Sequence, residues 1–159
     1  MRKMVLSIFV DNTFGVLSRV SGLFSRRGYN IDSLTVGETE NPEYSRMTVV
    51  VTGDEQILDQ IKKQVEKLED VKEVKELDPS SSVYRELILV KIAATKEARQ
   101  GVISIAEIFR AKIVDVTPDS LIAELTGDQS KLEAFLKLLS DYKILEIART
   151  GITGLSRGV

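Results

Sequence analysis

Residues 3–28 read KMVLSIFVDNTFGVLSRVSGLFSRRG, and this stretch decides how the chain begins to fold. Its first eight residues form a short apolar run that is typical of a β-strand. Apolar residues then recur at the spacing of one helical face: Val16, Leu17, Val20, Leu23 and Phe24. Gly28 suits the left-handed position that ends a helix, and Arg26 and Arg27 complement the negative end of the helix dipole. The stretch therefore predicts a strand, a turn that contains Gly15, and a helix.

The next fifty residues complete one folding unit. Strands are predicted at YNIDSLTV (29–36) and SRMTVVVTG (45–53). Asp54 is placed to cap a second helix, and the alternating run VKEVKEL (71–77) closes the unit as a half-exposed strand. The resulting order βαββαβ is that of a ferredoxin-like sandwich, in which two helices cover one face of an antiparallel sheet.

The second half of the chain repeats this pattern after DPSSSVY (78–84), which is typical of a linker. The similarity extends to individual residues, because equivalent helices begin with GDEQILDQI (53–61) and GDQSKLEAF (127–135). We therefore predict an α+β chain with two ferredoxin-like βαββαβ domains in tandem, at residues 1–78 and 79–159.

In this topology the second strand, YNIDSLTVGE (29–38), lies at an edge of the first sheet. It is long, alternating and free of proline, and such an edge tends to pair with another chain. We expect it to pair with a copy of itself, so that one sheet continues across a homodimer. The alternative is that it packs against the second half of its own chain.

The composition excludes several functions. The chain has 22 basic and 24 acidic residues, a net charge of -2, and no Cys or His. Without a basic field, a nucleic-acid partner is not expected. Without Cys or His, we expect no thiolate nucleophile, no common zinc site and no catalytic residue. Asp115 lies in an apolar strand, but a role at the strand end explains it better than catalysis. No membrane span or signal peptide is predicted, and we expect a cytoplasmic protein.

The turn DNTFG (11–15) has two interpretations. In the structural one, Asn12 or Thr13 caps the helix and Gly15 eases the turn. In the functional one, the free N–H groups at the helix start receive a carboxylate, and Gly15 lets the ligand approach the backbone. Asp11 or Asn12 would then accept hydrogen bonds from an ammonium group. Val16 and Leu17 would supply an apolar wall. Together these groups fit a free amino acid.

Asn30 adds a second part to this hypothesis. Asparagine is depleted in strands, yet Asn30 stands at the start of the predicted edge strand. If two copies pair along that strand, Asn30 of one copy can face the turn of the other. A ligand held there would favour the dimer by mass action.

Several stretches together resemble the small regulatory subunits of acetohydroxyacid synthase (acetolactate synthase), whose N-terminal half is an ACT domain. The resemblance rests on DNTFGVLSRVSGLFSRRGYNIDSLTVGETE (11–40), SRMTVVVTGDE (45–55), RELILVKI (85–92), EIFRAKIVDVTPDSL (107–121) and RTGITGLSRG (149–158). It implies a non-catalytic subunit in branched-chain amino acid synthesis. Such a subunit binds a large catalytic subunit, raises its activity and makes it sensitive to valine.

The resemblance also implies a valine site at the ACT dimer interface. By position, Asn12, Gly15 and Asn30 match best, while Asp11, Val16, Leu17 and Ile31 flank them in the same motif. Thiamine diphosphate, Mg and FAD are expected on the catalytic subunit, and no cofactor on this chain. The second half lacks the Asn…Gly arrangement in ATKEARQG (94–101), so no amino acid is expected there.

Two alternative functions and the role of the tail stay open at this point. The chain could be a free-standing amino-acid sensor without an enzyme partner. A small ferredoxin-like enzyme is disfavoured by the lack of His and Cys. The tail GITGLSRGV (151–159) fits a contact with the catalytic subunit and a frayed terminus equally well. An amino-acid pocket at the turn would discriminate weakly between apolar side chains, so isoleucine or leucine would compete with valine.

Overall fold

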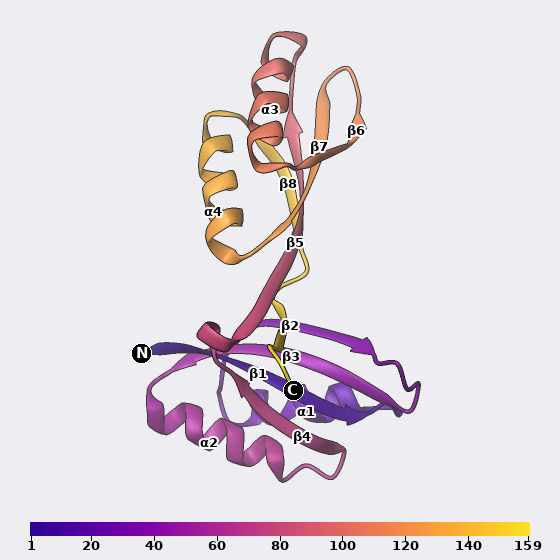
Figure 1. The fold of residues 1–159 in the computed structure, drawn as a ribbon, viewed down its shortest axis with the longest axis vertical. Coiled ribbons are helices and arrows are strands. Elements are labelled where there is room, and N and C mark those ends of the chain that lie inside the picture. The colour runs from indigo at the N-terminus through magenta and orange to yellow at the C-terminus, as the bar shows by residue number, and fades with distance from the viewer. The chain divides into compact units, whose positions relative to one another are not determined.

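The computed structural model describes all 159 residues and divides into two compact units (Figure 1). The first unit contains Met1–Tyr84 and Ile152–Val159, and the second contains Arg85–Gly151. The sequence places the boundary at residues 78 and 79 and assigns the whole tail to the second half. In the structure the end of the chain instead returns to the first unit.

The first unit has the predicted order of elements: β1 (Arg2–Asp11), α1 (Val16–Arg26), β2 (Ile31–Glu38), β3 (Tyr44–Gly53), α2 (Glu55–Glu66) and β4 (Val71–Leu77). Its sheet is antiparallel between neighbours, in the order β2-β3-β1-β4. This confirms the ferredoxin-like fold and the edge position of β2.

The main core of this unit lies between the sheet and its two helices, which cover the same face (Figure 1). Alternate residues of β1 and β3 point into it, as the two-residue period of a strand requires. The buried members are Met4, Leu6, Ile8, Val10, Val16, Val20, Leu23, Phe24, Met47, Val49, Val51, Leu58, Ile61 and Val65.

The opposite face of this sheet carries a smaller apolar cluster that includes the C-terminal tail. Ile152 is 8% exposed and packs with Val5, Val50 and Leu77, and Tyr84 lies against them. Residues Thr153–Ser156 then form β9, which pairs with β5 (Ser82–Ala93). The interpretation of the tail as a frayed terminus is therefore wrong for residues 152–156, because it is held by a strand pairing and a buried side chain.

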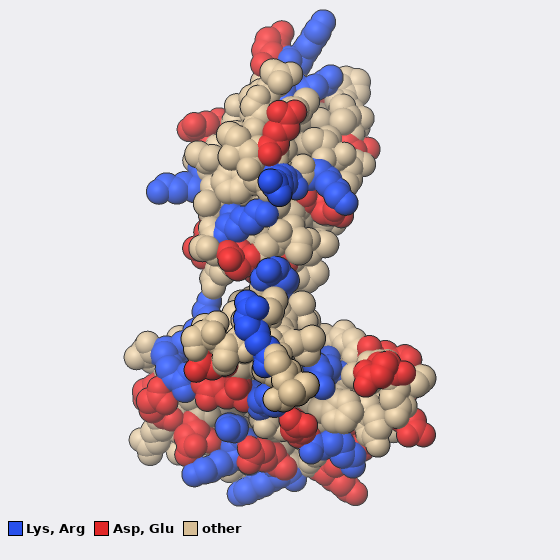
Figure 2. Space-filling view, in the orientation of Figure 1, with Lys and Arg blue, Asp and Glu red and all other residues tan.

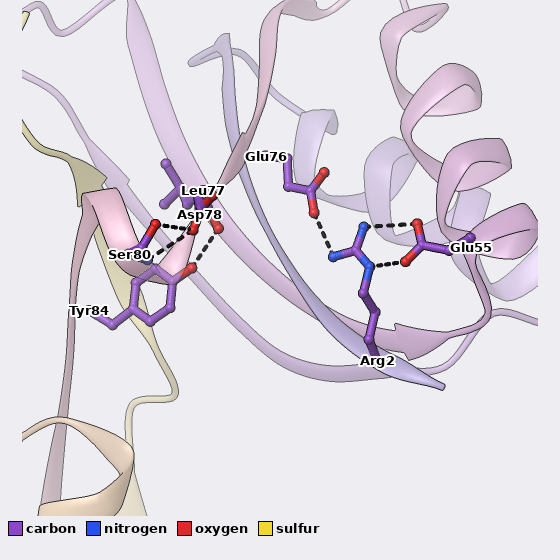
Figure 3. Close-up of polar contacts among 7 residues, drawn as sticks. All are labelled: Arg2, Glu55, Glu76, Leu77, Asp78, Ser80 and Tyr84. Carbon is purple, nitrogen blue, oxygen red and sulfur yellow. Dashed lines mark hydrogen bonds and ion pairs between the residues drawn. The ribbon is translucent and has the colours of Figure 1, made fainter.

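Polar contacts secure the strand ends near this cluster (Figure 3). Arg2 at the start of β1 bonds to Glu55 of α2 and, at 2.7 Å, to Glu76 of β4. The Tyr84 hydroxyl donates to the carbonyl oxygen of Leu77 at 2.6 Å. The predicted linker is thus ordered: it holds a 3-10 turn at Pro79–Ser81 and then enters β5.

The second unit repeats the architecture with β5 (Ser82–Ala93), α3 (Lys96–Phe109), β6 (Lys112–Val116), β7 (Ser120–Gly127), α4 (Gln129–Leu138) and β8 (Ile144–Arg149). Its strand order, β6-β7-β5-β8, is equivalent to that of the first unit. The predicted internal repeat is therefore a repeat of topology as well.

Charged side chains of both signs are interspersed over the surface shown in Figure 2. That mixture gives no continuous basic patch on this face for a phosphate backbone to follow. None of the helices is long and apolar enough to cross a membrane.

Replacing Ile152 should show that the tail stabilises the first unit. Ile152→Ala removes a buried side chain from the cluster on the open face of the sheet, so the free energy of unfolding should fall by about 2 kcal/mol. Leu155→Ala is the matched control, because Leu155 lies in the same tail but is 61% exposed; its effect should stay within about 0.5 kcal/mol. Urea unfolding followed by circular dichroism measures both, and equal effects would contradict the packing role.

The stability should also fall in acid. Hydrogen bonds hold the pKa values of Glu55, Asp70, Asp78 and Asp128 below their ordinary values of 4.5 and 3.8. The unfolded chain therefore binds protons more readily than the folded one. The stabilisation is fully present above the ordinary values and is lost as the pH falls below them, through the lowered pKa values.

Asp128→Asn tests this linkage with the helix cap preserved, since asparagine caps as well as aspartate does. In Asp128 the backbone N–H of Lys131 is the main cause of the lowered pKa. The variant should match the parent in acid and be less stable near neutrality. Urea midpoints measured across this pH range would contradict the assignment if the two curves stayed parallel.

Candidate functional site

Helix α1 begins in an unusual way. Gly15 occupies its N-cap position with φ 84°, in the left-handed region that side chains other than glycine rarely adopt. No side chain caps the helix, and its first turn contains no acidic residue. The Val16 N–H donates to the carbonyl oxygen of Thr13 at 3.4 Å, so the N–H groups of Leu17 and Ser18 are those open to an external acceptor at this positive helix end.

The other three α-helices are closed at the same position. Their first turns receive side-chain oxygens from Asp54, Thr95 and Asp128. Thr95 caps α3, which is the equivalent of α1 in the second unit. The prediction that Asn12 or Thr13 caps α1 is wrong. The N-cap residue is Gly15, which follows both of them in the chain, and neither side chain bonds to the first turn of the helix. The cap position that has no side-chain partner in the first unit is therefore occupied by the Thr95 hydroxyl in the second unit.

Asn12 and Asp11 are both engaged in holding the turn. The Asn12 side-chain amide donates to the carbonyl oxygen of Pro42 at 2.9 Å, and its backbone N–H donates to Glu43 at 2.7 Å. The Asp11 carboxylate lies 3.5 Å from the Lys72 ammonium group. These contacts give both residues a structural role in shaping the turn. That Asn12 or Asp11 also binds an amino acid stays a prediction.

Arg19 belongs to the same place, although the sequence analysis missed it. Its guanidinium forms two hydrogen bonds to the Asp70 carboxylate, at 2.5 and 3.1 Å, and a third to the carbonyl oxygen of Phe14 at 3.4 Å. The bond from Arg19 lowers the pKa of Asp70. A Cβ placed on Gly15 would lie 2.9 Å from Arg19 Nη1. The spacing of one helical turn from Gly15 was the available signal.

The apolar residues of the turn divide into exposed and buried ones. Phe14 is fully exposed and Leu17 is 43% exposed, so both offer surface beside Gly15. Val16 is 4% exposed and belongs to the core of the unit. Of the two residues predicted as an apolar wall, Leu17 is therefore the one that presents surface.

Asn30 and Ile31 lie far from this turn within one chain. Asn30 is exposed and directly precedes β2, and Ile31 pairs with Val51 near the start of β1. The turn follows the end of β1, where Asp11 pairs with Tyr44. The structure therefore does not bring Asn30 together with Gly15 in a single protomer.

The groups at the turn are suited to binding a ligand. It offers open N–H groups, a guanidinium already paired with a carboxylate, and exposed apolar surface. No group of three or more His, Cys, Asp or Glu side chains in the chain is placed to hold a metal ion. The arrangement suits a small carboxylate-bearing ligand.

Comparisons with known proteins match both halves of the chain. Residues 6–73 match the AHAS small subunit-like ACT domain, and residues 85–158 match the small subunit of acetolactate synthase. The chain is 52% identical to the acetolactate synthase isozyme 3 small subunit of Escherichia coli (strain K12) over 155 residues, which is 97% of this chain and 95% of that protein. It is 50% identical to a probable acetolactate synthase small subunit of Methanothermobacter thermautotrophicus, over 97% of this chain and 92% of that protein.

A solved structure agrees over the whole length. The small subunit of acetolactate synthase from Thermotoga maritima superposes with a TM-score of 0.92 at 43% identity, covering 100% of this chain and 99% of that one. Fold, sequence and length thus agree, and the chain belongs to the family of acetolactate synthase small subunits.

Proposed function

We propose that this chain is the non-catalytic regulatory subunit of an acetolactate synthase and senses valine. The observation that carries the proposal is the uncapped start of α1 at Gly15, which offers N–H groups to a carboxylate. The Arg19 guanidinium, paired with Asp70, lies beside it, and Leu17 and Phe14 add apolar surface. An amino acid needs such a combination, since one end is an anion and the side chain is apolar.

A homodimer through β2 would complete the site. In the sheet, β3 runs antiparallel to both β1 and β2, so β1 and β2 run parallel to one another. Antiparallel pairing of β2 with a second copy places the start of the copy's strand beside Glu38. The turn at Asp11–Gly15 follows the same end of β1. Asn30 and Ile31 of the copy would thereby approach the turn that they cannot reach in their own chain.

The binding energy required is modest. Sensing of a metabolite needs a dissociation constant between 1 mM and 1 μM, which is about -4 to -8 kcal/mol. Charge-assisted hydrogen bonds contribute roughly 1.5–3 kcal/mol each, so a few of them with one apolar wall suffice. One methylene changes the affinity by only ~1–3 kcal/mol, so isoleucine and leucine would compete with valine.

The partner in this proposal is a large catalytic subunit. The relatives are named as small subunits of acetolactate synthase, which implies a larger chain that carries the active site. Thiamine diphosphate, Mg and FAD would belong to that chain, and the complex would act in the cytoplasm in branched-chain amino acid synthesis. Valine would then give feedback inhibition through the regulatory subunit.

Gly15→Asp should abolish valine binding, because its carboxylate would lie where the ligand's carboxylate belongs. Titration calorimetry should show a loss of affinity of at least about tenfold, which is 1.4 kcal/mol. Asn30→Ala should weaken binding without unfolding the chain, since Asn30 is exposed.

Gly28→Asp is the matched control for Gly15→Asp. Gly28 also has a positive φ, of 71°, and no heavy atom lies within 4 Å of its Cβ position. The two variants therefore share the backbone strain and the added charge but differ in position. Equal valine binding by all three variants and the parent would contradict the pocket assignment.

Reconstitution tests the regulatory role itself. Adding this chain to the catalytic subunit should raise acetolactate synthase activity, and valine should then lower it. The Gly15→Asp variant should still activate but should respond to valine only weakly. If the chain neither binds the catalytic subunit nor changes its activity, yet binds valine, the free-standing sensor is the correct description.

A further inference from the structure

A second candidate binding site lies on the open face of the first sheet, opposite the helices. It is a groove of about 430 Å³ between the second half of β2 and the tail strand β9. This volume is in the range of ligand pockets, roughly 300–1,000 Å³. None of the residues predicted for the valine site lines it. The groove is therefore a separate feature from the turn at Gly15.

Arg46 lines the groove with its guanidinium held in place. Nη1 donates to Ser7 Oγ at 2.8 Å, and the guanidinium carbon lies 5.3 Å from the centroid of the Phe9 ring. Ser7 is only 3% exposed, so its hydroxyl is a fixed partner. No Asp or Glu forms an ion pair with Arg46. The other side of this planar fork is free to bind an oxyanion with two parallel hydrogen bonds.

Gly37 keeps the space beside Arg46 open. The two residues pair directly between β2 and β3, so a side chain at either position points to the same face. A Cβ on Gly37 would have no heavy atom within 4 Å. Its φ is not in the left-handed region, so the backbone does not require glycine there. A glycine inside a strand without a conformational reason marks close approach of a ligand or another chain.

The tail completes the groove. Thr153 lines it from β9, and Thr35 and Thr48 line it from the sheet. The Thr35 hydroxyl donates to the carbonyl oxygen of Ile152 at 3.4 Å and so fixes the tail to β2. A Cβ on Gly154 would lie 2.9 Å from Tyr84 and 3.1 Å from Leu77, so the glycine lets β9 pack closely against the unit. The wall formed by β9 is therefore built into the fold.

We propose that this groove binds a small anion through a carboxylate or phosphate group held by the Arg46 guanidinium. The hydroxyls of Thr48 and Thr153 supply additional hydrogen bonds to its oxygens, while the hydroxyl of Thr35 is engaged by the tail. Glu38 and Glu40 line one end of the groove and are exposed. Their negative charge opposes polyanions, so a ligand with a single oxyanion group fits best.

Titrations of the full chain with acetate and with inorganic phosphate, at constant ionic strength, test the proposal. Amide resonances of Gly37, Thr48 and Thr153 should shift and saturate with at least one of the two anions. Saturation with acetate alone identifies a carboxylate ligand, and saturation with phosphate alone identifies a phosphate ligand. Absence of saturable shifts with both anions overturns the proposal.

Two variants locate the binding. Arg46→Gln removes the charge but keeps a donor for Ser7. Gly37→Val fills the groove, and it should fold well because a β-branched residue suits a strand and meets no atom there. Each should weaken anion binding at least about tenfold, the loss expected for one charge-assisted pair.

Arg27→Gln is the control for general loss of positive charge, since Arg27 contacts Gln64 on the helical side. It should leave anion binding unchanged; an equal loss in Arg27→Gln and Arg46→Gln would show non-specific attraction and overturn the proposal. Valine titration of the same samples separates the two sites. The Arg46→Gln variant should keep whatever valine affinity the parent has, so either site can fail without the other.

Discussion

The central position of β1 determines what the first unit can do. β1 pairs with β3 along its whole length and with β4 on its other side, which leaves β2 at the edge beyond β3. Two successive antiparallel pairings make β1 and β2 parallel. The turn after β1 and the residues before β2 are then at opposite ends of one sheet. A site that uses both must therefore be assembled from two copies, and the exposed edge of β2 is the element that can join them.

The left-handed backbone conformation of Gly15 shapes the turn at the end of β1. Gly15 enters α1 from the left-handed region, and no side chain then reaches the first turn of the helix. The turn is held from outside by contacts distant in sequence, of which the pair of Arg19 and Asp70 is the strongest by geometry. Because other residues hold the frame, the N–H groups of Leu17 and Ser18 are left to water or to a ligand. In the equivalent turn of the second unit, the Thr95 side chain accepts from the Ala98 N–H, so the start of that helix is capped.

Local patterns in the sequence were sufficient to predict the order of elements, the repeat and the edge strand. Periodicity carries this information within ten or so residues, and the ferredoxin-like order then follows from known topology. Contacts between distant residues could not be predicted in this way. Arg19 and Asp70 are 51 positions apart, and Ile152 reaches the face of β1 from the far end of the chain. The cap was mispredicted because Asn12 has the right residue type, while the N-cap residue is Gly15, three positions later, in a backbone conformation that the sequence alone does not place.

The two faces of the first sheet meet at the start of β3. Arg46 in the groove is two residues from Tyr44, which pairs with Asp11 beside the turn, and the Tyr44 ring lies 4.9 Å from the Phe9 ring that supports Arg46. An anion on one face and an amino acid on the other would thus act on the same few residues of β1 and β3. Any effect of one ligand on the affinity for the other must then be equal in both directions, because binding free energies are linked. Since the tail forms a wall of the groove, the C-terminal residues would share in that coupling without touching the turn at Gly15.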